Sequence, residues 1–208
     1  MNVDNRLRTQ EEKYSSDYST PYPPEVADAL NDLSQETVRD FERPIMMVPD
    51  TQRKLYYQLV KLLRPNYILE IGTFTGATAI AMACAFPSSS KVVSLDIDPK
   101  CMQVARKYIN RLQYGDRVEL RVGPALVSLK ALKQEHSQRQ YDLIFIVLYR
   151  GYVHREAGYE EKITIKKDIM KKWTKAVCEF NEYVLQNPSL QVVMLPVFNG
   201  VSFISKSP

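Results

Sequence analysis

A chain of 208 residues with 45% hydrophobic residues can bury the core of one domain, which excludes disorder of the whole chain. The 28 Lys and Arg residues barely outnumber the 24 Asp and Glu residues, so charge does not indicate nucleic acid as a partner. Apolar runs stay far below the roughly 20 residues of a membrane helix, and three widely spaced cysteines predict neither a disulfide framework nor a zinc site. We therefore expect a cytoplasmic protein that does not enter a membrane.

The N-terminal third predicts an arm followed by two amphipathic helices. Residues 1–20 are polar and show no periodicity, so we expect a flexible arm, with a single domain over 21–208. Apolar residues at three- and four-residue spacings then predict a helix over 24–41. A second helix is expected to start with Asp50 as its cap and to end at Arg64.

The middle of the chain alternates β-branched runs with helical patterns. Four strands separated by helices predict parallel βαβ units with right-handed crossovers, which is a doubly wound α/β domain. A long amphipathic helix over 165–184 and an antiparallel hairpin over 192–204 are expected after it. In chain order, the expected strands are 67–71, 91–95, 118–122 and 143–146, and the helices between them are 76–86, 99–112 and 123–132.

The turn after the first strand carries the candidate binding residues. Gly72 and Gly76 let the backbone approach a ligand, and Asp96, at the end of the second strand, can bind two ribose hydroxyls. The segment 73–75 does not supply the Gly-x-Gly-x-x-Gly phosphate site of dinucleotide folds. Because Glu70 is acidic, it would repel a phosphate and attract an ammonium group. The pattern favours S-adenosylmethionine over NAD, and the open alternative is that the two glycines merely ease a tight strand-to-helix turn.

The segment Leu-Glu-Ile-Gly-Thr-Phe-Thr-Gly at 69–76 resembles the signature of the cation-dependent O-methyltransferases of the caffeoyl-CoA and catechol type. The resemblance implies a Rossmann-like class I methyltransferase sheet with helices on both faces and S-adenosylmethionine as cofactor. It also implies methyl transfer to a hydroxyl of a small, catechol-like or phenolic acceptor. Further agreement lies at Ser19–Pro24, Met46–Val48, Leu95–Asp98, Gly123–Leu126, Glu179–Glu182, Val193–Pro196 and Asn199–Val201.

The same resemblance implies cofactor-binding roles for six positions. Glu70 is similar to the residue that holds the methionine portion of the cofactor, and Gly72 and Thr73 are similar to residues that follow its backbone. Thr78 matches a small polar contact, Asp96 the ribose contact and Ala125 the adenine edge.

The resemblance breaks after the predicted fourth strand. Family members continue with Asp-Ala-Asp-Lys, a helix, a fifth strand and an Asp-Asn pair, whereas here Ile146 leads directly into 147–153, which resembles the segment after that pair. The simplest alignment omits on the order of 40 residues. The sheet is therefore expected to lack one interior strand and its helix. In the family the missing aspartates and asparagine hold a divalent cation.

These missing residues leave the sequence with no predicted metal site and no predicted catalytic residue. His154, Glu156, Glu160 and Glu161 are the candidate substitute ligands, and a solvated charged loop is the simpler interpretation. We expect a loosely attached C-terminal third with a mobile 151–162 loop and possible homodimerisation, rather than 147–149 acting as a makeshift strand. The alternatives are a catalytically silent S-adenosylmethionine-binding or interaction protein and a truncated isoform.

Overall fold

The computed structural model describes residues 5–85, 89–146, 164–195 and 201–206. By packing, the chain divides into two compact units, Met1–Val147 and Leu148–Pro208, and each unit is described by itself. The expected division into an arm and a single domain stays a prediction. In the part of the chain that is described, no helix has the length and apolar character needed to cross a membrane.

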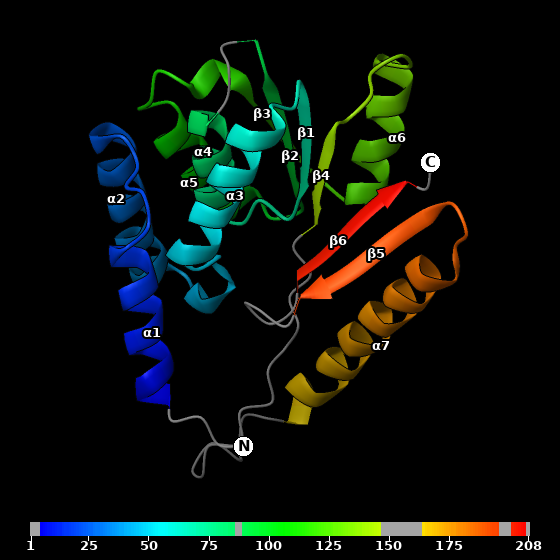
Figure 1. The fold of residues 1–208 in the computed structure, drawn as a ribbon, viewed down its shortest axis with the longest axis horizontal. Coiled ribbons are helices and arrows are strands. Elements are labelled where there is room, and N and C mark those ends of the chain that lie inside the picture. The colour runs from blue at the N-terminus through cyan, green and yellow to red at the C-terminus, as the bar shows by residue number, and fades with distance from the viewer. Residues whose placement is uncertain (1–4, 86–88, 147–163, 196–200, 207–208) are drawn as a thin grey trace. The chain divides into compact units, whose positions relative to one another are not determined.

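The first unit is built on a four-stranded parallel sheet in the order β3-β2-β1-β4 (Figure 1). This order is the one in which the first four strands of a doubly wound fold lie. The predicted α/β class is therefore confirmed, and all four strands lie where the sequence placed them. Their bounds are β1 Tyr67–Ile71, β2 Lys91–Asp96, β3 Val118–Val122 and β4 Leu143–Ile146.

Helices cover both faces of this sheet. On one face, Ile68 of β1 and Val92 of β2 pack against the helices α3 and α4. On the other face, Leu69 and Val93 pack against Leu132 of α6, which Figure 1 shows across the sheet from α3 and α4. The helices of the sheet region are α2 Pro24–Asp40, α3 Asp50–Leu63, α4 Ala77–Ala85, α5 Pro99–Ile109 and α6 Ala125–Glu135, with short 3-10 helices at Pro44–Met46 and Gly115–Arg117.

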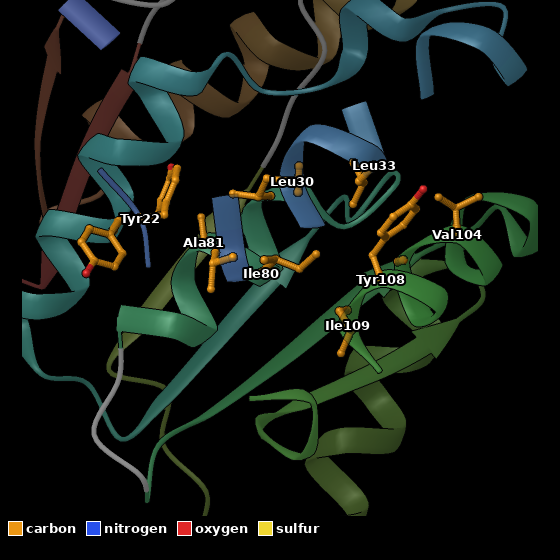
Figure 2. Packing of buried hydrophobic residues seen from close by; sticks show 12 residues of the cluster. Tyr22, Leu30, Leu33, Ile80, Ala81, Val104, Tyr108 and Ile109 are labelled. Atoms are coloured by element: carbon orange, nitrogen blue, oxygen red, sulfur yellow. The ribbon is translucent and has the colours of Figure 1, made fainter. Parts of the chain in front are cut away.

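The largest core cluster joins α2, α4 and α5 (Figure 2). The predicted stripe of α2 presents Leu30 and Leu33, which pack with Ile80 of α4 and Tyr108 of α5. Helix α4 is buried over Ala77–Ala83 because it lies between α2, α3 and the sheet. Full burial of each leucine or isoleucine contributes about 1.5–3 kcal/mol, so this cluster fixes the helix that follows the candidate binding turn.

Helix α1, Asn5–Asp17, occupies most of the segment for which the sequence predicts an arm. The sequence analysis does not predict this helix, and the expected flexibility of residues 1–20 stays a prediction. Polar contacts with α3 hold the helix, since Ser16 Oγ donates to Asp50 Oδ2 at 2.5 Å and Lys54 Nζ donates to Ser16 O at 2.8 Å. The sequence analysis predicts Asp50 as the N-cap of α3. In the structure Pro49 occupies the N-cap position, and Asp50 is the first residue of the helix.

The second unit contains α7, Thr164–Gln186, and a hairpin of β5, Leu190–Leu195, and β6, Val201–Lys206. The strands pair antiparallel with Val192 opposite Ile204, as the sequence predicts. On the side of β4 away from β1, no strand pairs among the described residues. The predictions for 147–149 and 151–162 lie outside the described residues.

Candidate functional site

The carboxyl ends of three parallel strands meet at one edge of the sheet. Glu70 of β1 lies opposite Ser94 of β2, and Asp96 at the end of β2 lies opposite Val122 of β3. In open α/β sheets the crevice beyond these carboxyl ends is the usual place for a ligand. The candidate residues that are distant in sequence are thus brought to the same edge.

The loop from β1 to α4 has an unusual backbone that is fastened to β2. Gly72 and Gly76 adopt φ angles of 99° and 92°, and Phe74 also has a positive φ of 49°. Such angles favour glycine, because L side chains are strained there. The Gly72 N–H donates to Leu95 O at 2.8 Å, and the Phe74 N–H donates to Asp96 Oδ2 at 2.7 Å.

Gly76 has a packing role in addition to the tight strand-to-helix turn that the sequence analysis kept open as an alternative. A Cβ at this position would lie 2.7 Å from the Ala105 Cβ of α5, closer than real Cβ atoms approach. Gly76 therefore allows the turn to pack closely on α5. The packing explanation holds for Gly76 and leaves Gly72 as the glycine at the candidate binding edge.

Glu70 is a fully buried carboxyl group whose two oxygens differ in their hydrogen bonds. Ser94 Oγ donates to Oε2, whereas Oε1 has no hydrogen-bond partner among the described residues. Burial raises the pKa of Glu70 to about 8, with a smaller raising effect from the Asp96 charge and an opposing effect from Ser94. An unpartnered buried oxygen is costly, so a ligand that brings a donor to it gains binding energy.

Asp96 is held in place while its carboxylate stays partly exposed. Its Oδ1 accepts from the Asp98 N–H at 2.9 Å, and its backbone oxygen accepts from the Gly123 N–H at 2.8 Å. Each carboxylate oxygen can accept more than one hydrogen bond. Asp96 is therefore fixed between three loops and keeps acceptor capacity for hydroxyl groups.

A small pocket lies beside this edge and is lined in part by Gly72, Thr73 and Thr78. Thr78 is buried in the first turn of α4, and the segment Met46–Val48 forms another wall. Ala125, the first residue of α6, is half-buried next to the Gly123 turn and does not line this pocket. The structure thus joins Gly72, Thr73 and Thr78 in one pocket and places Ala125 at the neighbouring strand end.

Sequence reasoning missed Ser94, which contacts both Glu70 and Thr73. It is a hydroxyl residue within the otherwise apolar run Val92–Leu95, and it is fully buried. Buried hydroxyls in proteins are normally hydrogen-bonded. A polar residue in the interior of an apolar strand, with Glu70 near the end of the preceding strand, is the signal that could have identified it.

The described residues contain no group of three or more His, Cys, Asp or Glu side chains that could hold a metal ion. The residues considered as substitute ligands, from His154 to Glu161, lie outside the described residues. The positions after β4, where the family resemblance implies the ligands of a divalent cation, also lie outside the described residues.

Comparison with known proteins gives a consistent picture. The O-methyltransferase family model matches residues 20–155. Caffeoyl-CoA O-methyltransferase 1 of Eucalyptus globulus is 25% identical over 181 residues, covering 76% of this chain and 74% of that protein. The catechol O-methyltransferase of Niastella koreensis is 36% identical over 103 residues, which are 50% of this chain and 46% of that protein. The SAH-bound Podospora anserina methyltransferase PaMTH1 has the same fold, with a TM-score of 0.81 at 22% identity over 100% of this chain and 98% of that chain.

The Eucalyptus alignment also shows that this chain is shorter within the matched region. Its 181 positions cover 76% of the 208 residues, which is about 158 residues, so about 23 positions of the relative have no counterpart here.

Proposed function

Since the chain belongs to the O-methyltransferase family, we propose that it binds S-adenosylmethionine at the carboxyl edge of β1 and β2. The reaction of such a site is methyl transfer to a hydroxyl of a small, catechol-like or phenolic acceptor. The observation that carries the proposal is the buried Glu70 carboxyl with an unpartnered oxygen, close enough to the fixed Asp96 for that charge to raise its pKa. A ligand with an ammonium group and a ribose satisfies both carboxyl groups at once.

Each residue at this edge has a distinct task in the proposed complex. Glu70 accepts hydrogen bonds from the ammonium group, and Asp96 accepts them from the ribose hydroxyls. The backbone of Gly72 and Thr73 lies along the part of the cofactor that connects these two groups. Thr78 offers a hydroxyl in the pocket, and Ala125 lies toward the adenine. When bound, the cofactor supplies an electrophilic methyl group on a sulfonium. The protein residues fix its two ends so that this methyl has a defined position.

A catalytically silent S-adenosylmethionine-binding protein is the second candidate, and one observation favours it. The residue after β4 is Val147, followed by Leu148, where family members carry the Asp-Ala-Asp-Lys segment. The oxygen ligands that activate an acceptor hydroxyl are thus missing from that position of the sequence. Binding and turnover are therefore separate questions for this chain, and we test them separately.

The acceptor, the compartment and the assembly form the finer part of the proposal. We infer a small-molecule acceptor and a cytoplasmic location, and the latter is supported by the free thiols of Cys84, Cys101 and Cys178. We infer a homodimer that forms through the exposed apolar side chains of the hairpin, such as Val193 and Met194. Cell fractionation and analytical ultracentrifugation of the full chain test these two points.

Calorimetry with the folded full chain tests cofactor binding. We expect S-adenosylmethionine and S-adenosylhomocysteine to bind, and Asp96→Ala to weaken binding by about 1–3 kcal/mol because charge-assisted hydrogen bonds are lost. Asp116→Ala is the matched control, since Asp116 is an exposed carboxylate that precedes β3 at the opposite edge. Absence of heat with folded wild-type protein, or equal affinity in Asp96→Ala, would refute the proposal.

A further inference from the structure

A short chain of hydrogen bonds connects the sheet interior to the pocket. Ser94 of β2 lies opposite Glu70 of β1 in the strand register, and its Oγ donates to Glu70 Oε2. The same Oγ lies 2.6 Å from Thr73 Oγ1. All three side chains are buried, with exposed fractions of 0% for Glu70 and Ser94 and 4% for Thr73. Thr73 in turn lines the pocket.

The direction of this chain depends on the protonation of Glu70, because each hydroxyl has a single proton to donate. When Glu70 is ionised, Ser94 donates to Oε2 and accepts from Thr73, and Oε1 remains a free anionic acceptor. When Oε2 carries a proton, Glu70 donates to Ser94, and Ser94 donates to Thr73. The two hydroxyls can therefore hydrogen-bond Glu70 in both protonation states, and in the ionised state both of their donors align toward the carboxylate.

We propose that Ser94 and Thr73 are positioning residues that hold Glu70 for the amino-acid end of the cofactor, and that binding of this end releases one proton from the Glu70 carboxyl. This inference rests on the proposed function. The step is balanced: a neutral carboxylic acid and a ligand ammonium form a carboxylate–ammonium pair, and the carboxyl proton goes to the solvent. No other bond forms or breaks.

The surroundings of Glu70 explain why its proton is present before the ligand binds. The pKa of Glu70 is raised to about 8, chiefly by burial and to a smaller extent by the Asp96 charge, against the lowering effect of the Ser94 hydrogen bond. From α3, Tyr56 faces this group and stays neutral, since burial and the Glu70 charge raise its pKa to about 12 against the lowering effect of Gln52. On the β4 side, the register neighbour of Glu70 is the uncharged Phe145. A bound ammonium group would reverse this balance, because an adjacent opposite charge favours the carboxylate.

Two ligands that differ only at the amino-acid end provide the first test. S-Adenosylhomocysteine carries the ammonium group, and 5′-methylthioadenosine has the same nucleoside and thioether without it. Calorimetry at pH 6–8, in buffers of different ionisation enthalpy, counts the protons released. With S-adenosylhomocysteine we expect the release of close to one proton at pH 7, and an affinity that rises about tenfold for each unit of increasing pH. With methylthioadenosine we expect neither effect.

Variants of the full chain separate positioning from folding. Ser94→Ala should weaken S-adenosylhomocysteine binding at pH 7 by roughly ten- to a hundredfold and leave the affinity for methylthioadenosine unchanged. It should also shift the pH dependence of S-adenosylhomocysteine binding to higher pH, because the Ser94 hydrogen bond lowers the pKa of Glu70. Ser94→Thr, which keeps the hydroxyl, should restore the affinity. Ser90→Ala, a buried serine before the other end of β2, is the control and should change neither ligand. Thr73→Val serves as a second probe with the same expectation if Ser94→Ala does not fold.

The outcomes distinguish this inference from the proposed function. If folded wild-type protein binds neither ligand, the proposed function fails. If both ligands bind but no proton is released, the proposed function stands and the proton release from Glu70 is wrong. If Ser94→Ala weakens both ligands equally, the proposed function stands and the positioning role of Ser94 is wrong.

Discussion

At the scale of single residues, Glu70 links the stability of the protein to pH. A buried carboxyl without a full set of partners is stable in the fold only when it is protonated. Its pKa rises from 4.5 to about 8, so the folded state keeps a proton that the unfolded chain loses. The contribution to stability is thus fully present below about pH 4.5 and is lost as the pH rises toward 8.

The variant Glu70→Gln tests this linkage in the ligand-free protein. Each unit of pKa difference corresponds to about 1.4 kcal/mol, so the free energy of unfolding of the wild type should fall relative to Glu70→Gln from pH 5 to pH 8. Urea unfolding at four pH values measures the difference. Hydrogen bonds from Lys107 and Tyr108 lower the pKa of Glu36, so Glu36→Gln is a control whose effect should be constant over this range. Parallel curves for wild type and Glu70→Gln would show that Glu70 does not titrate there.

The candidate site was only partly predictable from residue types. Glu70, Gly72 and Asp96 were found because their positions at the ends of two strands match a ligand-binding edge. Ser94 was not found, because its role depends on the strand register that places it opposite Glu70. A single sequence indicates which residues of a strand share a face, but it does not indicate which residue of the neighbouring strand lies opposite each of them.

At the scale of elements, hydrophobic periodicity predicted the four parallel strands and the helices between them. Helix α1 was missed because its contacts are polar and distant in sequence, such as the bond from Ser16 to Asp50. Strand β4 also differs from the inner strands in a way that periodicity does not show. Its Ile144 is 54% exposed, whereas Ile68 in β1 is fully buried, so within the described part of the first unit β4 is less covered than β1.

The sequence that follows β4 leads to a prediction about turnover. Because the acidic cation ligands of the family are missing after Ile146, we expect very slow methyl transfer to catechol-like acceptors. Magnesium or manganese should not stimulate it, and a chelator should not reduce it. Transfer of a radiolabelled methyl group by purified protein measures both effects. Residual transfer that falls in Asp96→Ala would come from the proposed site, and robust metal-dependent methylation would contradict the prediction.

At the scale of the whole molecule, the residues proposed to bind the cofactor all belong to the first unit. Its inner strands are buried, with Val92 and Val93 fully covered. The hairpin of the second unit leaves apolar side chains of both strands exposed, including Val193 on β5 and Phe203 on β6. Parallel strands are stable when other elements cover both faces of the sheet. We therefore expect the lowest protection of backbone amides from hydrogen exchange in the hairpin and in β4, the last strand of the described sheet.

Hydrogen exchange of the full chain, with and without S-adenosylhomocysteine, tests most directly whether a complete cofactor site persists in the first unit. In the ligand-free protein we predict slower exchange in β1, β2 and β3 than in β4 and the β5–β6 hairpin. The ligand should slow exchange further at residues 72–74 and 96–98 and leave the hairpin unchanged. Equally strong protection in β4 and the hairpin would show that the sheet is closed after all. In folded protein, exchange at 72–74 and 96–98 that does not respond to the ligand would contradict a cofactor site at this edge.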